Sequence, residues 1–113
     1  MAYKDLREFL AKLEEEGQLV RVKEEVDPEP NIGAAGRASA NLKNGPAVMF
    51  EKVRGYKNPV VTMVHGSWAN HALMLGMDKN TPVKDQFFEL VRRWNKYPVP
   101  AKCVEDAPFK KNI

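Results

Sequence analysis

The sequence predicts a small α/β (or α+β) domain in which a mixed sheet is flanked by helices. Its 113 residues suit one domain, or one piece of a larger protein, with a modest core. Stretches 6–13 and 83–94 carry apolar residues at helical spacing. Three runs rich in valine, 18–26, 47–53 and 59–64, have the length and composition of strands.

The first helix has signals at both ends. Asp5 is expected to be its N-cap, and Glu8, three residues later, can close a capping box. Gly17 is expected at the position just beyond the helix, where a left-handed backbone is common. One apolar stripe connects these ends, made of Leu6, Phe9, Leu10 and Leu13.

The middle of the chain alternates helix and strand signals. Pro30 is well placed to start a helix over 31–43, whose many alanines permit close packing on a sheet. Asn44–Pro46 is a turn signal. The strands predicted at 47–53 and 59–64 could form a hairpin, although the five-residue link between them leaves other pairings open.

The stretch HGSWANHALMLG, residues 65–76, holds the best candidates for binding contacts. Ser67 is expected to cap a helix that Gly76 ends. Polar residues that leave the end of a buried strand often contact a ligand. The candidate contact residues are therefore His65, Ser67, Trp68 and Asn70. The alternative, which this stretch alone favours, is that they only cap and pack the helix.

The two histidines of this stretch do not predict a metal site. His65 and His71 are six residues apart, on either side of a helix cap. Zinc prefers histidines four apart on one helix, or short finger spacings, and no cysteine or carboxylate stands near them in the sequence. We therefore expect no metal ligands here and assign neither histidine a role.

The last helix has the strongest apolar pattern of the chain. Thr81 is expected to be its N-cap, and Pro82 occupies the first helical position. Its stripe consists of Val83, Phe87, Leu90, Val91 and Trp94. Since an aromatic residue at helical spacing usually packs in the core, Trp94 is predicted to be core, with stacking on a cofactor as the alternative.

Composition excludes several classes of function. The net charge of +3 is spread along the chain, which argues against a nucleic-acid partner. A single cysteine, Cys103, excludes an internal disulfide and a multi-cysteine zinc site. No apolar run reaches the roughly 18 residues of a membrane span, and the charged start is unlike a signal peptide, so we expect a cytoplasmic protein. No residue pattern supports a catalytic, cofactor-binding or metal-ligating set.

Several motifs in one order resemble the start of the UbiD-type decarboxylases. The opening YKDLREFLAKLEEEGQLVR resembles the family's D-L-R-x-F-L helix and the E-x-x-G-x-L-x-R motif that leads into its first strand. The matching residues are Asp5, Leu6, Arg7, Phe9, Leu10, Glu14, Gly17, Leu19 and Arg21. The segment GPAVMFEKVRGY resembles a second family motif through Gly45, Pro46, Ala47, Phe50, Val53, Gly55 and Tyr56. The likeness extends from about Tyr3 to Pro100.

The segment VHGSWANHALMLGMDKNTPVKDQFFELVRRW resembles one branch of that family. This branch decarboxylates hydroxyarylic acids such as 4-hydroxybenzoate or vanillate. The resemblance implies a carboxy-lyase that removes CO₂ reversibly and without oxidation. It also implies prenylated FMN, a divalent metal (Mn or Mg) and K⁺ in the full-length enzyme, with none of them expected on this chain alone.

The resemblance carries no catalytic residue onto this chain. The family's catalytic Glu–Arg–Glu network and its cofactor ligands lie in a central domain that follows the matched segment. We therefore expect residues 1–100 to be the family's N-terminal domain and 101–113 to be a linker or truncated edge.

The implied partners are the central and C-terminal domains of the decarboxylase, further copies in a homo-oligomer, and small decarboxylase subunits. Exposed apolar faces near Phe87, Trp94 and the tail are expected to meet the central domain. The alternative function is a stand-alone, non-catalytic binding or assembly module.

Overall fold

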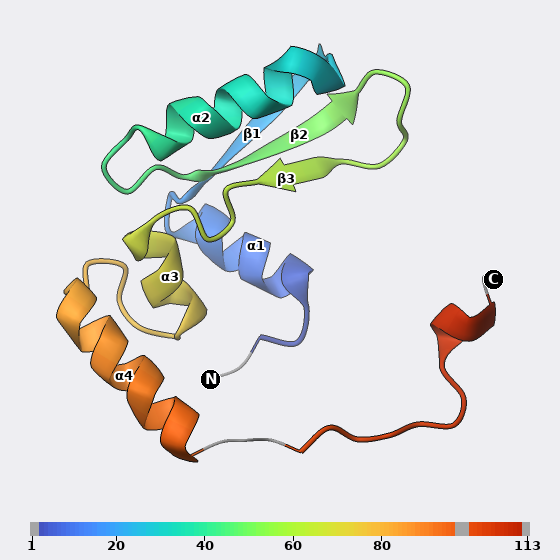
Figure 1. Ribbon diagram of the computed structural model, residues 1–113. Helices are drawn as coiled ribbons and strands as arrows, with labels where there is room; N and C mark the ends of the chain where they lie inside the picture. The colour runs from blue at the N-terminus through green and yellow to red at the C-terminus, as the bar shows by residue number, and fades with distance from the viewer. Residues whose placement is uncertain (1–2, 97–99, 112–113) are drawn as a thin grey trace.

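The computed structural model describes residues 3–96 and 100–111 (Figure 1). Its regular elements are, in chain order, α1 (Leu6–Glu15), β1 (Leu19–Val26), η1 (Pro28–Ile32), α2 (Gly33–Ala40), β2 (Ala47–Val53), β3 (Val60–Thr62), α3 (Trp68–Met74), α4 (Val83–Lys96) and η2 (Pro108–Lys111). The α/β class predicted from the sequence is confirmed.

The sheet is mixed, as predicted. Its strand order is β1-β2-β3, so that β2 is the central strand. β1 runs parallel to β2, with Leu19 beside Ala47, and β2 runs antiparallel to β3, with Val48 beside Thr62. Of the pairings that the sequence left open, the hairpin between β2 and β3 is the one that forms.

The helices cover both faces of the sheet (Figure 1). α1 packs on one face, where the buried cluster consists of Phe9, Leu10, Leu13, Leu19, Ala47 and Leu73. α2 covers the other face, above a second cluster of Val26, Val48, Phe50 and Val53. β1 and β2 both contribute to the two clusters, and β2, the central strand, lies in the middle of the core.

The predicted cap at Asp5 and the turn glycine at Gly17 are confirmed, whereas the Glu8 carboxylate accepts from the Lys4 N–H and not from that of Asp5. The Glu8 backbone N–H donates to Asp5 Oδ1 at 2.9 Å, and Gly17 has φ of +72°. The expected stripe is correct for its last three members but wrong for Leu6, which is 56% exposed. Leu6 lies in the first turn of α1, where it lines a surface groove with Val61 instead of the core.

The family-like motif that joins α1 to β1 closes an ion pair across the turn. The Arg21 guanidinium donates to both carboxylate oxygens of Glu14, at 2.6 and 2.9 Å. The hydrogen bond to Arg21 lowers the pKa of the Glu14 carboxyl. The glutamate and arginine of that motif thus connect the end of the helix to the strand.

α2 lies unusually close to the turn that precedes β2. Ser39 Oγ donates to the Pro46 carbonyl oxygen at 2.6 Å. A Cβ atom at Gly45 would lie 1.9 Å from the Ser39 carbonyl oxygen, so no side chain fits there. The glycine of the G-P-A motif is therefore required by packing.

The C-terminal segment extends away from the body of the molecule (Figure 1). The radius of gyration is 16.8 Å, compared with about 13 Å for a compact chain of about 100 residues. Val104 and Phe109 are exposed on it. Part of the linker or edge expected at 101–113 lies outside the described residues. Of the helices that the structure describes, none combines the length and the hydropathy that a membrane span requires.

Gly45→Ala should destabilise the fold by roughly 1–3 kcal/mol, as overpacking of a tight contact does. The matched control is Gly33→Ala, because a Cβ atom at Gly33 would meet nothing within 4 Å. Gly33→Ala should leave stability unchanged or raise it by up to about 1 kcal/mol, since alanine is the better helix former. Urea unfolding of the two variants measures both values, and equal effects would contradict the close packing of α2.

Candidate functional site

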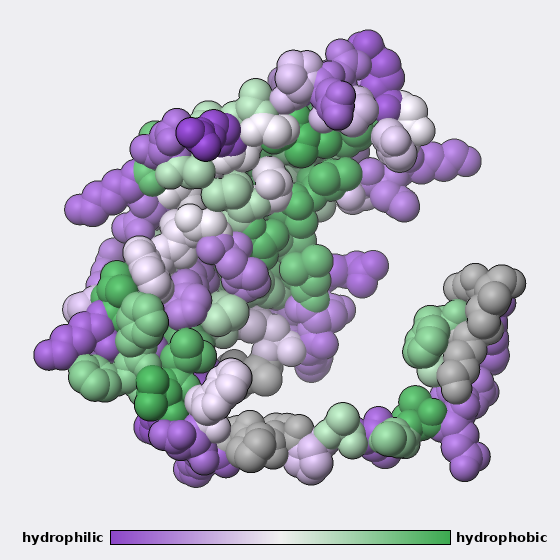
Figure 2. Space-filling view, viewed as in Figure 1, coloured by the Kyte–Doolittle hydropathy of each residue, from purple (hydrophilic) through white to green (hydrophobic). Residues whose placement is uncertain are grey.

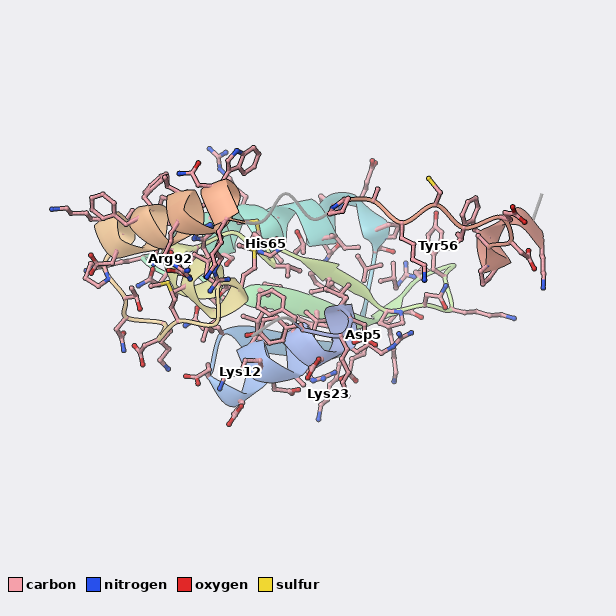
Figure 3. All side chains as sticks on the ribbon, turned by 90° about the horizontal axis from the view of Figure 1, so that it is seen from below. Asp5, Lys12, Lys23, Tyr56, His65 and Arg92 are labelled. Carbon is pink, nitrogen blue, oxygen red and sulfur yellow. The ribbon has the colours of Figure 1, made fainter. Side chains whose placement is uncertain are left out.

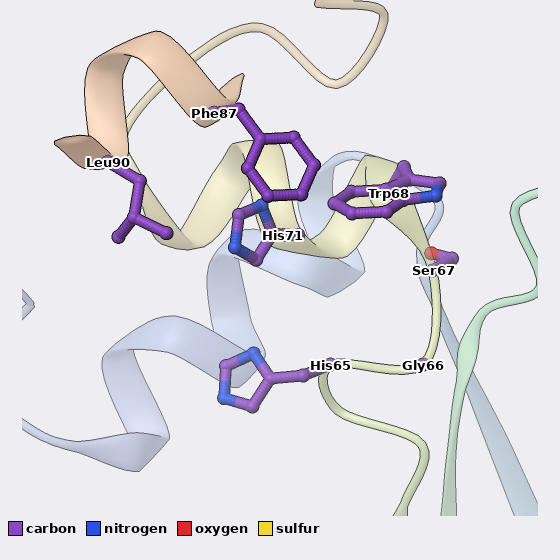
Figure 4. A pocket seen from close by; sticks show the side chains of 7 residues that line it. All are labelled: His65, Gly66, Ser67, Trp68, His71, Phe87 and Leu90. Carbon is purple, nitrogen blue, oxygen red and sulfur yellow. The ribbon is translucent and has the colours of Figure 1, made fainter. Parts of the chain in front are cut away.

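An open pocket lies between the loop that leaves β3, helix α3 and helix α4 (Figure 4). Its volume is about 410 Å³, and its lining residues are His65, Gly66, Ser67, Trp68, His71, Phe87 and Leu90. Ser67 caps α3 as predicted, since its Oγ accepts from the Asn70 N–H at 3.3 Å. Three of the four candidate contact residues, His65, Ser67 and Trp68, therefore meet at one site.

His65 is held on the pocket wall by α1. Its ring stacks on the Phe9 ring, with centroids 5.6 Å apart and planes 20° apart. The loop that carries it is tight: Met63 has φ of +60°, and a Cβ atom at Gly66 would lie 2.4 Å from Met63 Cε. The loop therefore presents His65 in a defined place.

Asn70, the fourth candidate contact residue, lies behind the pocket wall. It is fully buried, and its Nδ2 donates to the carbonyl oxygens of Val64 at 3.1 Å and Met63 at 3.5 Å. These bonds tie the loop that leaves β3 to helix α3. Asn70 thus fixes the loop and does not line the pocket.

A buried glutamine orients the second histidine. Gln86 Nε2 donates to the carbonyl oxygens of Trp68 at 3.1 Å and Thr81 at 2.9 Å. Gln86 Oε1, 2.8 Å from His71 Nδ1, must therefore be the acceptor. It follows that His71 Nδ1 carries a hydrogen, which leaves Nε2 of the neutral ring as an acceptor on a pocket-lining residue.

Polar residues attach α4 to α3. Gln86 is the one residue of α4 that is buried among those described. Arg93 Nη2 donates to the Leu75 carbonyl oxygen at 2.6 Å, and Arg93 Nε donates to Glu89 at 2.7 Å. Hydrogen bonds from Arg92 and Arg93 lower the pKa of Glu89 to about 2. We call Gln86, Glu89 and Arg93 the polar seam.

The apolar stripe of α4 faces away from the core. We call Val83, Phe87, Leu90, Val91 and Trp94 the α4 face; their exposed fractions range from 37% to 81%. The prediction that Trp94 is core is wrong, because it is 81% exposed. The polar seam packs on α3, whereas Phe87 and Leu90 line the pocket beside α3. Val91 and Trp94 lie outside, at 54% and 81% exposed.

The start of α4 also differs from the expectation. The Thr81 hydroxyl donates to the Asp78 carbonyl oxygen at 2.6 Å, so it closes the preceding turn instead of capping the helix. The helix begins at Val83, and Pro82 precedes it, with a carbonyl oxygen that accepts from the Gln86 N–H at 3.2 Å. Pro82 therefore lies at the capping position and not at the first helical position expected from the sequence. No pattern in the sequence singles out Gln86, since a glutamine within a helix usually faces water.

The described residues thus form a small α/β module with an aromatic pocket. Among them there is no group of three or more histidine, cysteine, aspartate or glutamate residues that could hold a metal ion. The chain belongs to the family described as the 3-octaprenyl-4-hydroxybenzoate carboxy-lyase N-terminal domain, the UbiD N-terminal domain, whose profile matches residues 10–90. The resemblance inferred from the motifs is confirmed.

Curated relatives align along nearly the whole chain. The chain is 71% identical to a phenolic acid decarboxylase of Sedimentibacter hydroxybenzoicus, covering 98% of this chain and 24% of the relative. A phenolic acid decarboxylase of Bacillus subtilis (strain 168) is 56% identical, covering 99% and 24%. The chain therefore spans about a quarter of the length of the curated relatives that it matches.

Solved structures of related decarboxylases also match this chain. The vanillic acid decarboxylase of Sedimentibacter hydroxybenzoicus is 72% identical and matches with a TM-score of 0.86 in both its open and its closed form. The match covers 92% and 93% of this chain, respectively, and 22% of that chain. An evolved dimeric UbiD-class enzyme from Pelotomaculum thermopropionicum, in complex with prFMN, is 33% identical with a TM-score of 0.69, covering 90% of this chain and 22% of its own.

Gln86→Leu should destabilise the chain by roughly 2–3 kcal/mol, because it leaves buried partners of the amide without hydrogen bonds. Trp94→Ala should cost less than about 1 kcal/mol, because an exposed side chain loses little on truncation. Chemical denaturation of both variants gives the comparison. A larger loss for Trp94→Ala than for Gln86→Leu would place the α4 face in the core and refute the arrangement described.

Proposed function

We propose that this chain is the N-terminal module of a hydroxyarylic acid decarboxylase. The observation that carries the proposal is the 71% identity, over 98% of the chain, to a protein named phenolic acid decarboxylase. The reaction is a carboxy-lyase reaction: the bond between the ring carbon and the carboxylate carbon breaks, CO₂ leaves, and a proton takes its place on the ring. No net oxidation occurs, and the reverse reaction consumes CO₂.

The cofactor of such an enzyme is proposed to be prenylated FMN, with a divalent metal (Mn or Mg) and K⁺. One UbiD-class neighbour is described in complex with prFMN, which supports the flavin. The pocket of this chain does not fit it, because none of the described residues that line the pocket is a lysine or arginine able to pair with a flavin phosphate. We therefore propose that the flavin and the metals are held by the part of the enzyme outside this module.

The module itself is proposed to act as a scaffold. His65, Ser67 and Trp68 stay the proposed contact residues, at a pocket whose described lining includes two histidines and no other ionisable group. Asn70, the fourth candidate, is buried behind the pocket wall and supports the loop that carries His65. A phenolic acid carries a carboxylate, for which a bidentate arginine would be the expected partner. Contacts with neighbouring polypeptide suit this pocket better than contacts with the substrate.

Assembly and location belong to the same proposal. We propose a cytoplasmic homo-oligomer that can include small decarboxylase subunits and has no nucleic-acid partner. The support is the family membership and, for the last point, a charge of +3 that is spread along the chain.

The test replaces the aligned quarter of the Sedimentibacter decarboxylase with this chain. The chimera, produced in cells that make prenylated FMN, should retain flavin and release CO₂ from 4-hydroxybenzoate or vanillate. The 113-residue chain alone should do neither. A folded, flavin-loaded chimera without decarboxylase activity would contradict the proposed function, as would stoichiometric flavin on the isolated chain.

A further inference from the structure

The α4 face is an exposed apolar surface that no described part of the chain covers. Its members Phe87 and Trp94 are 52% and 81% exposed, and Figure 2 shows apolar side chains gathered over the region of α3 and α4. Contiguous exposed apolar surface of this kind marks an interface in soluble proteins.

The orientation of α4 is specified by directed hydrogen bonds. A helix that had merely settled on its neighbour would bury its apolar stripe. Here the Gln86 amide and the Arg93 guanidinium bind carbonyl oxygens of α3 and its C-terminal cap. These bonds fix the rotation of α4 about its axis, which leaves the α4 face exposed.

The α4 face continues into the pocket. Phe87 and Leu90 belong to both, and the Phe87 ring lies 5.6 Å from the Trp68 ring. The combined surface is aromatic at its centre and carries no charged residue among the α4 face members, which is the composition of an interface core. At its edge, His71 Nε2 offers one acceptor, oriented through Gln86. A protruding side chain with a nearby N–H or O–H donor would fit this recess.

We propose that the α4 face and the pocket together form the surface on which the rest of the decarboxylase polypeptide docks. The occupant is the segment that follows this module in full-length relatives, and the inference rests on the proposed function. About three quarters of the length of those relatives lies beyond the matched quarter, since the chain covers 24% of each.

A covalent connection supports this occupant. The described segment after α4 extends away from the helix and carries η2 (Figure 1), so the polypeptide that follows in the relatives is tethered to the module through this segment. Such a tether gives an effective concentration on the order of millimolar, which favours an intramolecular partner over a second copy. The relative's open and closed forms match this chain equally well, with a TM-score of 0.86, so the fold of the module is the same in both forms.

The test introduces a glutamate into the surface within the chimera described above. Leu90→Glu and Trp94→Glu place a charge on the α4 face, and glutamate is a good helix former. Tyr56→Glu is the matched control, because Tyr56 is 67% exposed at the β2–β3 turn, away from α4 (Figure 3). Limited proteolysis in the segment after α4 is the readout, since cleavage follows the population in which the module is detached.

Both surface variants should speed cleavage by at least about tenfold, and Tyr56→Glu should not. In the isolated chain, all three variants should change the melting temperature by less than about 4 °C. If Leu90→Glu unfolds the module, Trp94→Glu still gives the test, because Trp94 is highly exposed. Equal cleavage rates for all chimeras would overturn the inference. It would also be overturned if the isolated chain formed a dimer that Trp94→Glu breaks, because a second copy would then be the occupant. An inactive unmutated chimera would instead reject the proposed function.

Discussion

The hydrogen bonds of one buried amide determine how the last helix is attached. Gln86 is completely buried, and it satisfies two carbonyl oxygens and the Nδ1–H of His71. A buried amide that lost these partners would cost about 1–3 kcal/mol for each group left unpaired. Because a rotation of α4 would break them together, the amide fixes the side of the helix that faces α3 and the side that does not.

In this module the residues that form the core and the residues that line the pocket are different. The core lies on both faces of β2, in two clusters that α1 and α2 cover. The motifs that identify the family serve this core and its connections: Glu14 pairs with Arg21, and Gly45 permits the approach of α2. In this structure these residues connect and pack the helices and strands of the module.

Local features could be predicted from the sequence, whereas orientation could not. The cap at Asp5, the turn glycine at Gly17 and the cap at Ser67 depend on residues within one turn of each other, and all three are as expected. The apolar period of α4 predicts a helix correctly. The spacing of apolar residues does not show which neighbour covers the stripe. The expectation that Trp94 is core therefore depends only on how often aromatic residues at helical spacing pack in a core. Gln86 decides the matter through contacts with residues 5 to 18 positions away.

At the candidate site, too, local features could be predicted from the sequence and contacts between distant residues could not. The sequence indicates the stretch that holds His65, Ser67 and Trp68, because a strand end and a helix cap are visible as local patterns. It does not indicate that Phe87 and Leu90 form the opposite wall, since they come from another helix. It also suggests no role for His71, whose ring is oriented by a residue 15 positions away.

Iodide quenching of Trp94 tests the central claim, that polar contacts hold the apolar side of α4 outward. The measurement uses the Trp68→Phe chain, in which Trp94 is the single tryptophan, at a concentration where sedimentation shows a monomer. The account predicts quenching close to that of a free tryptophan derivative, because 81% of the Trp94 surface is exposed. Emission that iodide quenches poorly in the folded monomer would show Trp94 packed in the core and would contradict the account.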